Sequence, residues 1–112
     1  MKLKSIETTA LEICEEFQQL TKNTIGINLT NDIRENSKHL VALYQMKRTM
    51  DQLTEILPKH EVINQRTGEI IGELYNNEYI GNVMLSTNNS INSGIQHTEW
   101  HIRKISCRKL IL

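Results

Sequence analysis

The residues best suited to chemistry lie in one short stretch near the end of the sequence, HTEWHIRKISCRK, residues 97–109. This stretch contains two histidines, a glutamate, a cysteine, the only tryptophan and four lysines or arginines. Such side chains can bind a metal ion, hold nucleic acid or an anionic ligand, or keep the edge of a sheet soluble. If the stretch is a strand, alternation places Trp100 and Ile102 on one face. The other face then carries the polar row His97, Glu99, His101 and Arg103.

A zinc site would take His97, Glu99 and His101 as ligands, with His60 or Cys107 to complete it. Arg103 brings a positive charge to the same predicted face, and the spacing HxExH is much less specific than the helical HExxH. We therefore predict neither a metal site nor a cofactor. Whether this row has another role stays open.

Nucleic-acid binding is not favoured by the charge, because 13 basic residues balance 13 acidic ones. The charge is nevertheless uneven: residues 60–96 carry one basic and four acidic residues (1 − 4 = −3), and residues 97–112 carry four basic and one acidic (4 − 1 = +3). The four basic residues, with Trp100 and Tyr79 as stacking platforms, would form only a small footprint. A charged sheet edge that discourages aggregation is the commoner explanation of such charges.

Catalysis has little support in the sequence. The serines near the histidines lie in no GxSxG elbow. Cys14 and Cys107 form no CxxC pair, and Cys107 would be an activated nucleophile only if it were exposed. We predict a protein that is not an enzyme and has no catalytic residues.

Two amphipathic helices are predicted in the first half of the chain. The first has an apolar stripe with alternating spacings of three and four, at Leu3, Ile6, Ala10, Ile13, Phe17 and Leu20. The second begins at Asp32, a possible N-cap with Glu35 three residues on, and ends at Pro58. Its stripe is Leu43, Met46, Met50, Leu53 and Leu57, widened by Leu40 and Tyr44. Such stripes can also mate between copies, so we expect a homo-oligomer.

Strands are predicted from His60 onward. Residues 61–65 and 69–75 flank Arg66-Thr67-Gly68 as a hairpin, and residues 75–79 make a second turn. Further strands are expected at 79–87, 96–104 and 105–111, with a polar loop at 88–94. The predicted fold class is α+β: two N-terminal amphipathic helices followed by a mainly antiparallel β-sheet. Residues 1–112 then form a single domain, with a helical part (1–58) and a sheet part (59–112).

The sequence indicates a cytoplasmic protein. Its N-terminus meets charge before any apolar run of signal-peptide length, and no stretch approaches the roughly 18 apolar residues of a membrane helix. We expect no membrane partner.

A small anionic ligand is the binding hypothesis that the residues favour. The loop NNSINSG, residues 88–94, offers amide, hydroxyl and backbone donors of the kind that surround phosphates. Arg103 can clamp a phosphate, and Tyr79 offers an aromatic face. These positions would converge if strands 79–87 and 97–104 paired across the loop.

The order of elements, with an aromatic (Tyr79), a polar asparagine loop (Asn88 and Asn89) and an arginine near the C-terminus (Arg103), resembles the phage Thoeris anti-defence sponge proteins. That family is not enzymatic: it assembles as oligomers and sequesters immune signals of the cyclic ADP-ribose type. The resemblance implies that Tyr79 stacks on adenine, Asn88 or Asn89 holds a ribose or phosphate, and Arg103 stacks or neutralises phosphate. It also implies a phage protein that acts in the host cytoplasm.

Two other functions stay open. One is a protein-binding inhibitor or immunity factor that acts on a partner enzyme through its surface, and the other is an enzyme that cleaves a cyclic nucleotide with His97 or His101 as general base. Arg103 distinguishes the first alternative from the sponge hypothesis. It should line a pocket in a ligand-binding protein and lie on an exposed surface in a protein-binding one.

Overall fold

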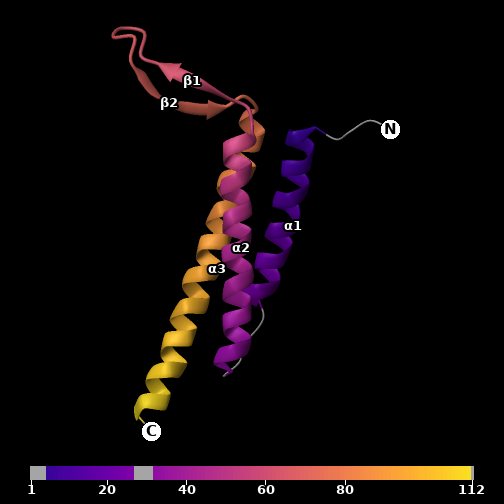
Figure 1. The fold of residues 1–112 in the computed structure, drawn as a ribbon, viewed down its shortest axis with the longest axis vertical. Coiled ribbons are helices and arrows are strands. Elements are labelled where there is room, and N and C mark those ends of the chain that lie inside the picture. Colours follow the sequence, from indigo (N-terminus) through magenta and orange to yellow (C-terminus); the bar gives the residue numbers. More distant parts are fainter. Residues whose placement is uncertain (1–4, 27–31, 112) are drawn as a thin grey trace.

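A computed structural model describes residues 5–26 and 32–111 of the chain, with residues 23–26 and 107–111 described by their backbone alone. It contains three helices and one hairpin: α1 (Ile6–Gly26), α2 (Ile33–Ile56), β1 (Lys59–Ile63), β2 (Ile70–Tyr75) and α3 (Glu78–Ile111). The three helices lie side by side, and the hairpin projects from one end of the bundle (Figure 1). The radius of gyration is 18.5 Å, against about 13 Å for a compact chain of this length. The molecule is therefore elongated.

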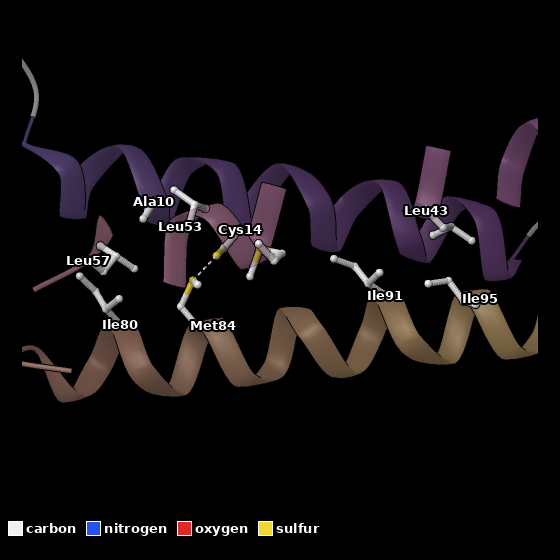
Figure 2. Close-up of a cluster of buried hydrophobic side chains, with 10 residues drawn as sticks. Ala10, Cys14, Leu43, Leu53, Leu57, Ile80, Met84, Ile91 and Ile95 are labelled. Carbon is white, nitrogen blue, oxygen red and sulfur yellow. Dashed lines mark hydrogen bonds between the residues drawn. The ribbon is translucent and has the colours of Figure 1, made fainter. Parts of the chain in front are cut away.

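Helix α3 is the central element, since α1 and α2 each pack along it and touch each other much less. Its 34 residues give a length of about 51 Å at the usual helical rise. The core is a row of apolar side chains between the helices (Figure 2). It comprises Ala10 and Cys14 of α1, Leu43, Met50, Leu53 and Leu57 of α2 or its C-cap, and Ile80, Met84, Ile91 and Ile95 of α3.

The boundaries of α2 are those that the sequence predicts. The Asp32 side chain accepts a hydrogen bond from the Arg34 amide at 2.9 Å, which makes Asp32 the N-cap. The helix ends at Ile56 with Leu57 as C-cap, because Pro58 supplies no amide proton and disfavours helical geometry in the residue before it. The hairpin is also confirmed: β1 and β2 pair antiparallel, and Gly68 has the positive φ (73°) that its turn requires.

The second half of the chain differs from the prediction. Residues 79–87, 96–104 and 105–111 are not strands, and residues 88–94 are not a loop: all lie within α3. The fold is mixed α+β, but its order is helix, helix, hairpin, helix. Residues 59–112 are therefore a hairpin followed by a long helix.

Polar residues in the buried stripe of α3 caused this error. Thr87 and Thr98 are buried in the middle of the stripe, where each hydroxyl donates to the carbonyl four residues earlier, Val83 or Gly94, at 2.8 Å. These bonds satisfy the hydroxyls inside the core, so threonine occupies positions where an apolar residue would be expected. Gln18 of α1 also donates to the Thr87 hydroxyl at 2.9 Å.

The two helical stripes are used mainly within one protomer. Leu43, Met50, Leu53 and Leu57 are buried in the core, whereas Ile6 and Leu20 of α1 and Tyr44 of α2 are 40–50% exposed. Leu3 lies outside the described residues. The α2 stripe is consequently covered by α3 and is not free to mate with a second copy.

Candidate functional site

The four residues predicted to bind a ligand do not converge within one protomer. Tyr79, Asn88, Asn89 and Arg103 all lie on α3. At about 1.5 Å of rise per residue, Tyr79 and Arg103 are roughly 36 Å apart along the helix. Successive residues of a helix are rotated by about 100° around its axis, so Asn89 and Arg103 lie on the same, outward-facing side of α3. Tyr79 and Asn88 lie to the two opposite sides of that face. The convergence expected from a strand pair is wrong, because there is no strand pair in this part of the chain.

Arg103 lies on an exposed surface. Its side chain is 75% exposed, and one guanidinium nitrogen lies 3.8 Å from Glu99 on the preceding turn. The shallow hollow beside it is lined by residues of α3 alone: Ser93, Gln96, His97, Glu99, Trp100 and Arg103. Arg103 therefore lies on an open surface of α3 and does not line an enclosed pocket.

The four residues of the predicted polar row, His97, Glu99, His101 and Arg103, lie in helix α3 and do not share one face of it. His97 and His101 are one turn apart, but Glu99 points toward α2, where its carboxylate accepts a hydrogen bond from the Tyr44 hydroxyl. This bond favours the protonated phenol, so it raises the pKa of Tyr44, with burial as a second cause. Among the residues whose side chains the structure describes, 5–22 and 32–106, no three histidine, cysteine or acidic side chains are grouped so that they could hold a metal ion.

Cys14 has the environment of a structural thiol. It is 1% exposed, and its thiol donates to the sulfur of Met84 at 3.6 Å. Burial raises the pKa of Cys14, with an opposing effect from the Thr87 hydroxyl. A buried, protonated thiol is a poor nucleophile. The side chain of Cys107 lies outside the described part of the structure.

The hairpin exposes apolar side chains on both faces. Ile63, Ile70, Ile71 and Leu74 are 52–64% exposed, and every residue of β2 except Tyr75 is exposed. A two-stranded sheet is marginally stable by itself in water. In addition, Glu61 lies directly opposite Glu73 in the ladder, and like charges in this position destabilise a strand pair. The hairpin is therefore an exposed apolar element with little stabilisation of its own.

A pocket of about 630 Å³ lies where the hairpin joins α3. Its lining is His60, Glu73, Leu74, Tyr75, Asn76, Glu78, Gly81 and Asn82. The His60 Nδ1 and Asn76 Oδ1 atoms are hydrogen bonded at 2.8 Å, which fixes the position of the imidazole. The charged side chains in this lining are carboxylates, so the pocket favours a basic group over a phosphate.

Asn77 positions these residues by starting α3. Its side-chain oxygen accepts from the amides of Tyr79 at 3.0 Å and Ile80 at 3.3 Å. The sequence indicated a turn at this point, and the same asparagine is a good N-cap. The signal that could have revealed α3 is the spacing of Ile80, Met84, Ile91 and Ile95, which are four, seven and four residues apart.

Comparison with known protein families, with curated proteins and with solved structures gives no match to the chain. The resemblance to the Thoeris anti-defence sponge proteins thus stays a prediction. No helix in the described part of the chain is both long enough and apolar enough to cross a membrane.

Proposed function

We propose that this protein is a non-enzymatic protein-binding factor that docks its projecting hairpin on a partner protein. The observation that carries the proposal is the exposure of Ile63, Ile70, Ile71 and Leu74 at one end of the molecule, each more than half exposed. Clustered exposed apolar side chains of this kind mark interaction sites in soluble proteins. The inhibitor or immunity-factor hypothesis is thereby preferred over sequestration of a nucleotide.

Two physical features support docking through the hairpin. The strands have unpaired outer edges, to which an extended segment of another protein can add as a further strand. The aliphatic side chains on each face then supply the apolar contact that makes such an interface stable. The Glu61–Glu73 pair favours a partner that brings a basic side chain to that face.

Site-specific photo-crosslinking tests this function. A photoreactive amino acid at Ile71 should give discrete crosslinks to one partner protein in the cells that produce this chain, identified by mass spectrometry. The same amino acid at Gln52, an exposed position of α2, is the matched control and should give none of them. Ile63→Glu should abolish the crosslink of the same amino acid placed at Ile70, because Ile63 and Ile70 are paired across the two strands and a charge there opposes burial of the face that they share. Identical crosslinks from Ile71 and Gln52 would contradict the proposal.

A ligand screen distinguishes the sponge hypothesis. A nucleotide that bound only the folded protein would raise its melting temperature by mass action. Since Tyr79, Asn89 and Arg103 are far apart along α3, we expect no shift with cyclic ADP-ribose isomers or cyclic oligonucleotides at millimolar concentration. A clear shift, with the ligand recovered intact, would favour sequestration instead.

A further inference from the structure

The side of α3 that faces away from α1 and α2 is exposed over most of its length. We call this side the outer face of α3; its residues recur every three or four positions, as Asn82, Leu85, Asn89, Ser93, Gln96, Trp100 and Arg103. All seven are exposed. At about 100° per residue they lie opposite the buried stripe of the same helix. The face runs for about 32 Å between Asn82 and Arg103.

Three hollows form one continuous line along the outer face. The pocket at the base of the hairpin and the next hollow share Asn82, and this second hollow and the one beside Arg103 share Ser93. The middle of the line is lined mainly by the small side chains of Ser86, Asn89, Ser90 and Ser93. Small side chains allow the backbone of another helix to approach closely.

The two large apolar residues of the outer face are placed symmetrically. Leu85 is 62% exposed and Trp100 is 55% exposed, and the midpoint between them falls between Asn92 and Ser93. If a second α3 ran antiparallel about that midpoint, Leu85 would lie opposite Trp100 of the second copy. Asn89 would then face Gln96, and Asn82 would face Arg103.

The charges select the antiparallel orientation. Glu73 and Glu78 lie at the hairpin end of the outer face, and Arg103 and Lys104 lie at its other end, with Lys104 Nζ 4.2 Å from the centre of the Trp100 ring. An antiparallel pair brings each acidic end to a basic end of the other copy. A parallel pair would instead place like charges together, which is unfavourable.

We propose that the outer face of α3 binds the same face of a second copy of this chain in antiparallel orientation, with a twofold axis at Asn92 and Ser93. Such an interface is isologous, so each contact is made twice. Its centre is small and polar, and its ends are held by Leu85–Trp100 contacts and by opposite charges. We expect a dissociation constant in the micromolar range that increases with added salt, because the charged pairs are exposed to solvent.

Sedimentation velocity on the full chain tests the dimer. The wild type should shift from monomer to dimer between low micromolar and millimolar concentration. Ser93→Glu places two carboxylates together at the axis and should weaken the dimer at least tenfold. Gln52→Glu adds the same charge on α2 and should leave it unchanged. A wild type that stays monomeric, or equal effects of the two variants with unchanged helical circular dichroism, would overturn the proposal.

Disulfide trapping tests the orientation. Asn89→Cys and Gln96→Cys are made as two separate proteins, each with Cys107→Ser and with the buried Cys14 retained. An antiparallel dimer should crosslink only in the mixture, because residues 89 and 96 of different copies face each other. The two residues 89 would be offset by about 10 Å along the helices. Crosslinking of Asn89→Cys by itself would indicate a parallel pair and refute the antiparallel one.

Discussion

The contact between Leu43 of α2 and Gly94 of α3 gives the sharpest test of the fold. Leu43 is 1% exposed, and a Cβ atom built on Gly94 would lie 3.2 Å from one Leu43 methyl and 3.4 Å from the other. This contact exists only if residues 88–94 are helical and packed, whereas the sequence indicated a polar loop there. Substitutions at both positions should therefore interact.

The expected free energies follow from this geometry. Leu43→Ala removes buried methyl groups and leaves a cavity, which costs about 3–5 kcal/mol. Gly94→Ala gains about 1 kcal/mol of helix propensity but forces Leu43 to move, an overpacking that costs about 1–3 kcal/mol. When alanine already replaces Leu43, the new methyl group meets open space and the propensity gain remains. We expect a favourable coupling of about 1–3 kcal/mol in the double variant.

Urea unfolding followed by circular dichroism gives the four free energies of this cycle. All four proteins are measured at one low concentration, so that self-association does not contribute. A chain of 112 residues has roughly 6 kcal/mol of stability at the low end of the usual range, so Leu43→Ala should still be folded enough to measure. Additive effects of the two substitutions would refute the packing of Leu43 on Gly94.

Three further predictions concern single residues. Gly68→Ala should destabilise the hairpin by about 1–2 kcal/mol, because alanine resists the positive φ at this turn. Amide hydrogen exchange should then become faster in the hairpin but not in the helices. Equal exchange in the hairpins of the wild type and the variant would contradict this. Cys14 should react with a thiol reagent at pH 8 only as fast as the protein unfolds, since its pKa is raised by burial; rapid reaction of a Cys107→Ser variant would show that Cys14 is accessible. In a spectrophotometric titration Tyr44 should ionise above the ordinary tyrosine pKa, and Tyr44→Phe should remove that step. The raised pKa of Tyr44 contributes stability below the ordinary tyrosine pKa near 10, and this stability is lost as pH rises through the folded-state value.

The parts of the fold that the sequence predicts are those with local signals. Asp32 and Pro58 delimit α2 through side-chain and ring chemistry that acts on the adjacent backbone. Gly68 identifies the hairpin because few other residues adopt its conformation. These features depend on neighbours in the chain, so they can be recognised without the tertiary structure.

The apolar spacing that marks helix α3 was obscured, because residues that look polar or loop-forming in the sequence are buried in its packed stripe. Thr87 and Thr98 count as polar in a hydropathy pattern, yet both are buried, and their hydroxyls bond to their own helix. Gly94 looks like a loop residue, but it permits the close approach of Leu43. The Asn- and Ser-rich outer face then completes the appearance of a loop.

The candidate site was affected by the same error. Tyr79, Asn89 and Arg103 form a plausible ligand-binding set only when strands fold back on each other, and a continuous helix separates them. The hairpin surface could not be inferred from the sequence, because adjacent apolar residues such as Ile70 and Ile71 also occur in strands that are covered on both faces. Only the tertiary structure shows that neither face is covered.

The two proposed interfaces have a joint consequence. In the antiparallel dimer the two hairpins lie at opposite ends of the assembly, so their outer parts, with Ile63, Ile70 and Ile71, remain free to dock on partners. A dimer would then bind a surface carrying many partner molecules through two contacts, and the second contact is strengthened by effective concentration. Ser93→Glu should therefore weaken binding to such a surface by tenfold or more, while its binding to one partner molecule in solution stays unchanged. Equal binding of wild type and Ser93→Glu to the dense surface would show that dimerisation through α3 does not contribute to binding by the hairpin.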